Sequence, residues 1–203
     1  CGQGAPRFAM WGDSHALSLF AAVQQAAGGA AGQLYTQSCP PLQNAYLDEK
    51  RSHRRCQRNT ETILQDLAAL PPDMPLVIAF RYSYYLLGYN EDPARRVSLR
   101  YLNLTPEEEA VDKATLYAGR LEATPCRAAG SRQHVYVVAP VPEIGVDVPR
   151  IVSRQLMTGN NSAFPQLSLD DYAARQKVVL AALQRAAARC NFTLLDPTTH
   201  LCS

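Results

Sequence analysis

The chain alternates short apolar runs with longer stretches in which apolar residues recur at helical spacing. The apolar runs have the length of strands and lie at residues 7–11, 33–36, 76–80, 134–139 and 191–195. The helical stretches lie between them, at residues 15–27, 54–70, 105–121 and 168–188. Strands that alternate with helices in this way predict an α/β fold, a three-layer α/β/α sandwich around a five-stranded parallel sheet.

Capping residues and prolines indicate where some of these elements begin and end. Thr105, Pro106 and Glu108 form the capping-box pattern of a helix start, so one helix is expected from there to about residue 121. Four prolines interrupt the stretch between residues 139 and 168, which is therefore expected to be a long loop. No internal repeat is visible, and a single domain is expected over residues 1–203.

Composition narrows the classes of function. The chain of 203 residues is 47% hydrophobic and 19% charged, which suits a globular domain with a substantial core. Its 20 basic and 18 acidic residues give a net charge of +2 and form no basic stripe, so no nucleic-acid partner is expected. No apolar run approaches the roughly 18 residues of a membrane-spanning helix. Because the chain starts without Met and without a signal peptide, we expect it to be an excised domain.

The six cysteines and four histidines include no C-x-x-C pair and no His/Cys cluster, so no metal site is expected. Cys39 and Cys56, with two prolines directly after the first, are spaced as a disulfide that closes a surface loop. That interpretation favours an oxidising compartment such as the periplasm or the cell surface. Six reduced thiols in a cytosolic protein remain the alternative.

A candidate nucleophile follows the first predicted strand, which ends in Gly12-Asp13-Ser14 directly before the first predicted helix. A serine at this turn places its hydroxyl at the sheet edge and its N–H at a helix start, where negative charge is favoured. An acyl-transfer nucleophile requires such an exposed hydroxyl and an N–H that can hold an oxyanion. The alternative is structural, since Asp13 or Ser14 could serve only as the helix cap.

Residues 12–16, Gly-Asp-Ser-His-Ala, resemble the first block of the SGNH (GDSL) hydrolase superfamily. The closer resemblance is to the SGNH domain fused to the membrane acyltransferase family three, the bacterial sugar O-acyltransferases. Further segments resemble that domain in the same order, at residues 38–42, 56, 76–82, 137–143 and 194–202. The resemblance covers nearly the whole chain and implies the flavodoxin-like SGNH-hydrolase fold.

The resemblance makes Ser14 the nucleophile and its own N–H one oxyanion donor, and Gly12, Asp13 and Arg81 are the expected oxyanion or substrate residues. Arg81, at the end of the third predicted strand, could supply charge to an oxyanion or orient the sugar. It could instead form a salt bridge or be a solvated strand end. The superfamily's second-block glycine and third-block asparagine are absent, and this chain has residues 37–39 and 80–82 in their places.

The superfamily's general base belongs to an Asp-x-x-His motif after the fifth strand. Asp196 and His200 are one residue further apart than that motif requires. In the fused subgroup, an Asp-Pro segment like the one at residues 196–197 precedes the catalytic pair. We therefore expect the base outside residues 1–203, in a last segment that this chain lacks, with His200 as the alternative base.

By this resemblance, the chain is the C-terminal extracytoplasmic domain of a bacterial membrane O-acyltransferase, on the periplasmic or extracellular face and tethered through a fused transmembrane domain. That membrane domain would deliver an acyl group, with acetyl as the expected one. Ser14 would carry the acyl group and pass it to a hydroxyl of a cell-surface glycan, without a metal or organic cofactor. A secreted carbohydrate esterase and a non-catalytic glycan-positioning module remain the alternatives.

The flavodoxin-like strand order also predicts a second disulfide, because it makes the fourth and fifth strands neighbours. Cys126 and Cys190 end the helices that lead into these two strands, so their Cα atoms should approach closely enough to be bridged. Cys1 and Cys202 are expected to be too far apart to pair with each other.

Overall fold

The computed structural model describes residues 5–36, 38–48, 53–92, 94–95, 97–159 and 165–201. Its main sheet has five parallel strands in the order β2-β1-β4-β6-β7. The strands are β1 (Phe8–Gly12), β2 (Gly32–Thr36), β4 (Leu76–Ala79), β6 (Val135–Val138) and β7 (Thr193–Leu195). All five predicted strands are present, and the flavodoxin-like order is confirmed because the last two strands are neighbours.

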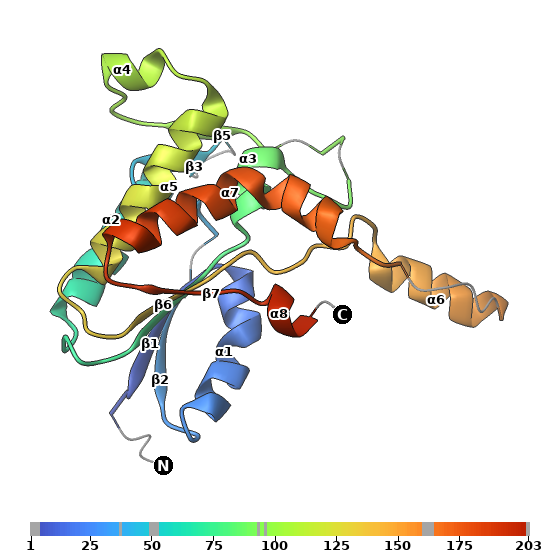
Figure 1. Cartoon of the computed structure of the whole chain (residues 1–203), viewed down its shortest axis with the longest axis horizontal. Helices are drawn as coiled ribbons and strands as arrows, with labels where there is room; N and C mark the ends of the chain where they lie inside the picture. Colours follow the sequence, from blue (N-terminus) through green and yellow to red (C-terminus); the bar gives the residue numbers. More distant parts are fainter. Residues whose placement is uncertain are drawn as a thin grey trace.

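Helices cover both faces of this sheet, which confirms the three-layer α/β/α architecture (Figure 1). One face carries α1 (Ser14–Ala26), and the other carries α2 (His53–Ala69), α5 (Lys113–Ala129) and α7 (Leu169–Arg189). Successive strand residues point to opposite faces, so β1 contributes to both cores. Ala9 and Trp11 join the larger core under α2, α5 and α7, whereas Phe8 and Met10 join the smaller core under α1.

The single helix expected over residues 105–121 is wrong, because two helices occupy this stretch. The capping box at Thr105 is present, but it opens only the short α4 (Pro106–Glu109). A second cap then begins α5, since the Asp112 carboxylate accepts hydrogen bonds from the N–H groups of Ala114 and Thr115. The second N-cap starts a new helix three residues after α4 ends, and α5 then continues past residue 121 to Ala129.

The structure adds further elements that the sequence pattern did not predict. These are α3 (Tyr82–Leu87), α6 (Val148–Thr158), α8 (Thr198–Leu201) and an antiparallel ribbon of β3 (Ala45–Leu47) and β5 (Leu99–Tyr101). The long loop expected between residues 139 and 168 is therefore wrong in part. Asp147 caps α6 by accepting from the Arg150 N–H, and Pro149 stands in the first turn, where a missing N–H costs nothing.

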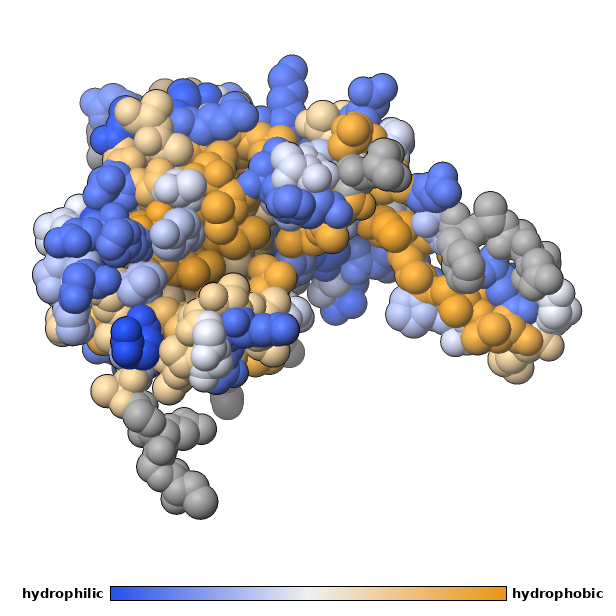
Figure 2. Space-filling view, turned by 60° about the horizontal axis from the view of Figure 1, so that its bottom comes forward, coloured by the Kyte–Doolittle hydropathy of each residue, from blue (hydrophilic) through white to orange (hydrophobic). Residues whose placement is uncertain are grey.

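Helix α6 projects away from the body of the domain as an arm (Figure 1). None of its described residues is buried, and its tip exposes Leu156 and Met157 to 80% and 87%. Figure 2 shows hydrophobic residues along one side of this arm. The arm therefore adds nothing to the two cores, and the segment that leads to it bears on the candidate site instead.

Both predicted disulfides are present. The Cα atoms of Cys39 and Cys56 are 5.4 Å apart, and those of Cys126 and Cys190 are 5.3 Å apart. The second bridge joins α5 to the end of α7, so it clamps two helices of the same layer. Two disulfides fit a domain in an extracellular or periplasmic setting. Cys1 and Cys202 lie outside the described residues.

Two negative observations apply to the part of the chain that the structure describes. None of its helices combines the length and the apolarity needed to cross a membrane. Among the same residues, no three His, Cys, Asp or Glu side chains gather as metal ligands would.

Candidate active site

The turn after β1 brings Ser14 to the carboxyl edge of the sheet. Gly12 is essential to this turn, because a Cβ there would lie 1.9 Å from the Ala79 carbonyl oxygen and 2.4 Å from the Ala16 Cβ. Only glycine lets the start of α1 lie so close to β4. Gly12 itself is buried, whereas Ser14, the first residue of α1, is exposed.

The Asp13 carboxylate stabilises this turn through three hydrogen bonds. Its Oδ1 accepts a hydrogen bond of 2.9 Å from the His15 N–H and so caps α1. Its Oδ2 accepts 2.9 Å from the Arg81 N–H and 3.1 Å from the Tyr85 hydroxyl. The capping role considered from the sequence is therefore real for Asp13, and the same carboxylate also ties the end of β1 to the end of β4 and to α3.

The charge on Asp13 is favoured by its donors. Burial alone would raise the pKa of Asp13, but the nearby His15 side chain and the N–H groups of Arg81 and His15 outweigh it and lower the pKa. The His15 Nδ1 lies 3.5 Å from Asp13 Oδ1, longer than an ordinary hydrogen bond. Burial, followed by the Asp13 charge, raises the pKa of Tyr85 well above its usual value, so that the phenol remains a donor to Asp13.

The Asp13→Asn variant is expected to be less stable by about 1–3 kcal/mol at neutral pH, because an amide nitrogen replaces one of two buried acceptor oxygens. The lowered pKa makes this contribution fully present above the pKa of an unfolded aspartate, about 3.9, and lost as pH falls through the folded value. Urea unfolding at pH 7, 5 and 3 should therefore show a stability gap that closes only below about pH 4.

Asp112→Asn is the matched control for this prediction, since Asp112 is an exposed N-cap whose carboxylate bonds only within its own helix start. Asn caps nearly as well as Asp, so the control should lose only a few tenths of a kcal/mol. An equal loss in the two variants would contradict the view that Asp13 joins three elements.

A cavity of about 290 Å³ opens beside Ser14. Its walls come from the ends of β1 and β3 and from the segments after β2 and β4. Its lining residues are Asp13, Ser14, Ser38, Leu47, Arg81, Tyr84, Tyr85 and Tyr89. In the described part of the chain, the Ser14 N–H makes no hydrogen bond, so it is available at this helix start. The cavity therefore offers a hydroxyl together with a free backbone donor.

The tyrosines of this cavity were missed by sequence reasoning. Tyr84 and Tyr89 meet edge to face with their ring centroids 4.9 Å apart, and the Arg81 guanidinium lies 5.4 Å from the first ring and 5.8 Å from the second. The signal that could have revealed them is four tyrosines within residues 82–89, directly after a strand that ends at the carboxyl edge.

Arg81 is engaged in ion pairs. Its guanidinium lies 2.8 Å from Glu91 Oε2 and 2.9 Å from Glu143 Oε1, and Arg175 reaches the other oxygen of Glu143 at 3.1 Å. Burial alone would lower the pKa of Arg81, but the hydrogen bonds that its guanidinium donates to the Glu91 and Glu143 carboxylates raise it above its usual value. Of the interpretations from the sequence, the salt bridge is present, and Arg81 still lines the cavity beside Ser14.

His200 is not among the residues that line the Ser14 cavity. It is exposed on α8, which follows the edge strand β7, and both β4 and β6 lie between β7 and β1. Asp196 accepts hydrogen bonds from the Thr198 N–H and hydroxyl, and within the described residues it forms no ion pair with His200. The structure thus brings Ser14, Asp13 and Arg81 together but leaves His200 apart from them.

A family model described as the SGNH domain fused to AT3 domains matches residues 1–203. No curated protein and no solved structure matches the chain. The observed α/β/α sandwich and the serine at the first strand-to-helix turn agree with that family. Since the match spans the whole chain, this protein belongs to the family of SGNH domains fused to AT3 domains, which are modules of the acyl-transfer or esterase type.

Proposed function

We propose that this domain carries an acyl group, expected to be acetyl, on Ser14 and transfers it to a hydroxyl group of a cell-surface glycan. One observation carries the proposal. Ser14 is exposed as the first residue of α1, its N–H has no hydrogen-bond partner among the described residues, and it lines a cavity at the carboxyl edge of the sheet. A hydroxyl and an oxyanion donor in one cavity are what an acyl-enzyme requires.

In the first half-reaction, Ser14 Oγ attacks the carbonyl carbon of the acyl donor while a base takes the Oγ proton. The oxyanion that forms accepts a hydrogen bond from the Ser14 N–H and is favoured by the positive end of the α1 dipole. Collapse of this intermediate expels the donor's leaving group, which takes up a proton.

In the second half-reaction, the acceptor hydroxyl attacks the Ser14 ester while its proton passes to the same base. The ester bond to Oγ breaks, and Ser14 recovers its proton. Arg81 is held by Glu91 and Glu143, so we assign it to positioning the cavity wall and the acceptor rather than to holding the oxyanion.

The acyl donor is proposed to be a fused membrane domain, because the family is defined by fusion to AT3 domains. Such a donor fits a domain on the periplasmic or extracellular face of the membrane, and the two disulfides agree with that setting. We place the base at a residue other than His200, outside the described part of the chain, because His200 lines no wall of the Ser14 cavity.

The His200→Gln variant is therefore expected to keep its rate of acyl transfer within about twofold, because Gln preserves the polarity of an exposed side chain. The rate is measured as acylated glycan formed per minute by the protein together with its donor domain. A loss of about a hundredfold or more, the range expected for a general base, would instead assign the base to His200.

A serine-directed fluorophosphonate tests the proposed acyl-enzyme. The protein, produced together with the donor domain, is expected to take up the probe on the peptide that contains Ser14. Ser18→Ala is the matched control because Ser18 is also exposed, one turn further along α1, and donates only to the Ser14 carbonyl oxygen. Labelling should be lost in Ser14→Ala and kept in Ser18→Ala.

Two results would overturn the proposal. An unlabelled Ser14 in folded protein would favour a non-catalytic module. Labelling of Ser14 with release of free acid, and with no acylated glycan at saturating acceptor, would favour an esterase that uses water.

A further inference from the structure

Three cavities follow one another along the carboxyl edge of the sheet. The cavity of about 290 Å³ beside Ser14 shares Arg81 with a second cavity of about 640 Å³, lined also by His15 and Glu91. The second cavity shares Glu143 with a third of about 520 Å³, which reaches the start of α7. Side chains of one ion-paired cluster thus form the walls between neighbouring cavities.

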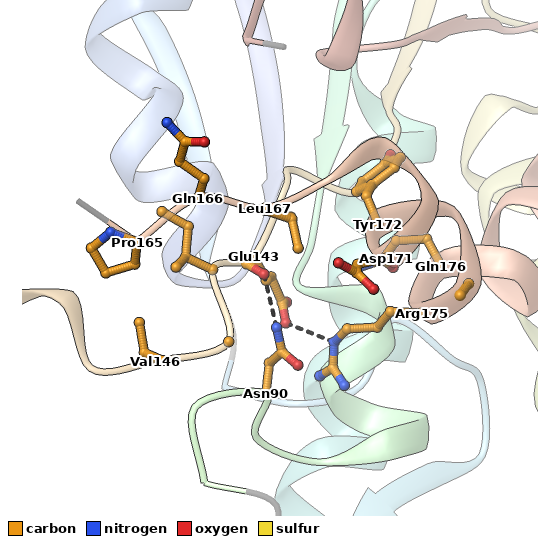
Figure 3. A pocket seen from close by; sticks show the side chains of 13 residues that line it. Asn90, Glu143, Val146, Pro165, Gln166, Leu167, Asp171, Tyr172, Arg175 and Gln176 are labelled. Carbon is orange, nitrogen blue, oxygen red and sulfur yellow. Dashed lines mark hydrogen bonds and ion pairs between the residues drawn. The ribbon is translucent and has the colours of Figure 1, made fainter. Parts of the chain in front are cut away.

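Figure 3 shows the third cavity, with Asn90, Glu143 and Arg175 joined by hydrogen bonds on one side. The Asn90 amide donates 2.8 Å to the Glu143 carbonyl oxygen, and Arg175 also donates 2.8 Å to the Gly88 carbonyl oxygen. These contacts connect the segment after α3 with the segment before α6 and with α7. This wall of the third cavity is therefore formed by three separate parts of the chain.

The apolar part of this wall is exposed to the same space. Ile144 and Val146 line both the second and the third cavity, and each is 37% exposed. Leu167 lines the third cavity from the segment before α7 (Figure 3). Apolar side chains beside fixed donors and acceptors suit a ligand with hydroxyl groups at its rim and C–H groups on its faces.

The charges of these walls disfavour an anionic ligand. Arg81 is paired with Glu91 and Glu143, and Arg175 is paired with Glu143. The other described charged groups of the lining, apart from His15, are the acids Asp13, Asp147 and Asp171. A bound phosphate or carboxylate would meet an excess of negative charge and no unpaired arginine among these lining residues.

We infer that the three cavities form one groove that binds a neutral oligosaccharide several sugars long. The inference rests on the proposed function, since it places the acceptor hydroxyl beside Ser14 and the following sugars along residues 143–146 and α7. A site for a single small ligand measures about 300–1,000 Å³, and the three cavities together exceed that range. The acceptor is thus recognised as a polymer segment, with its specificity set far from the reacting atoms.

Binding is tested on the folded Ser14→Ala protein, which cannot turn over, so the result does not depend on the acyl-enzyme. The probes are oligosaccharides released by mild acid from bacterial cell-surface polysaccharide, separated by size and divided into neutral and acidic pools by ion exchange. Amide chemical shifts report which cavities respond. The neutral pool of four to six sugars should shift residues of all three cavities, at a concentration where neutral monosaccharides do not.

A pair of alanines on α7 sharpens the test. Ala174 lines the third cavity, whereas its exposed neighbour Ala173 does not. Ala174→Trp should fill the far end of the groove and weaken binding of the longer neutral pool about tenfold, the loss of one or two hydrogen bonds with their contacts. Ala173→Trp should leave that affinity unchanged. In protein that keeps Ser14, fluorophosphonate labelling of this serine should be unaffected by either substitution, because neither alanine lines the Ser14 cavity.

Several outcomes would overturn the inference. In the chemical-shift experiment, these are equal shifts with the monosaccharides and the longer pools, tighter binding of the acidic pool, shifts confined to the Ser14 cavity, or no shift with any pool. In the variants, it is an equal loss of affinity in Ala174→Trp and Ala173→Trp. None of these outcomes bears on the acyl-enzyme, which is tested separately by labelling of Ser14. The experiments therefore distinguish failure of the groove hypothesis from failure of the proposed function.

Discussion

Ser14→Ala is expected to lower the rate of acyl transfer by about a thousandfold or more, the cost of removing a covalent nucleophile. The fold should be unaffected, because Ser14 is exposed and its hydroxyl makes no hydrogen bond within the part of the chain that the structure describes. The rate is measured as acylated glycan formed by the protein with its donor domain. The thermal midpoint of the same preparation checks the fold.

Ser38→Ala and Ser18→Ala are the controls for this loss. Ser38 lines the same cavity, and Ser18 is the next exposed hydroxyl along α1. Neither hydroxyl stands at the start of a helix beside a free N–H, so each variant should retain most of its activity. Acyl transfer that survives in folded Ser14→Ala protein would remove this serine from the mechanism.

Removal of the Cys126–Cys190 disulfide should give the largest loss of stability. The bridge spans 64 residues and constrains the unfolded chain more than the Cys39–Cys56 bridge, which spans 17. In the chain-entropy model these separations correspond to about 4 and about 3 kcal/mol. The Cys126→Ala/Cys190→Ala variant should therefore melt about 10 °C below the wild type, since about 2–4 °C is lost per kcal/mol at this chain length.

Two comparisons check the origin of this loss. Reduced wild-type protein should be less stable than the Cys126→Ala/Cys190→Ala variant, because it loses both bridges. The Cys39→Ala/Cys56→Ala variant should lose the smaller entropic contribution to the free energy of unfolding. Because both side chains are buried, a cavity cost adds to this loss. A change below about 1 kcal/mol in the Cys126→Ala/Cys190→Ala variant would contradict the entropic account.

Much of the fold could be predicted because its signals are local. The apolar runs that form β1, β4 and β6, and the Ser168 cap of α7, are properties of a few consecutive residues. The errors arose where two local signals competed. The capping box at Thr105 predicted a helix start correctly, but this helix ends at Glu109 and a second cap at Asp112 begins another. Pro149 is one of the prolines that predict a loop, although a proline in the first turn also favours a helix.

The residues of the candidate site likewise divide into those that a local pattern indicates and those that it does not. Ser14 was a candidate because a strand, a tight turn and a helix start follow one another within a few residues, and the resemblance to SGNH domains implied its role as nucleophile. The tyrosines of α3 and the partners of Arg81 were not predicted, because no short-range pattern distinguishes an aromatic residue in a core from one that lines a cavity.

The α/β alternation, the turn that carries Ser14 and the pairing of the cysteines follow from the amino-acid order. Each depends on periodicity, capping or element order, which short stretches of chain encode. How Ser14 is held and what surrounds it depend instead on contacts between distant parts of the chain. Asp13 meets Arg81 across 68 residues, and Arg81 meets Glu143 across 62. Such contacts exist because parallel strands place their carboxyl ends at one edge of the sheet, where residues distant in sequence become neighbours.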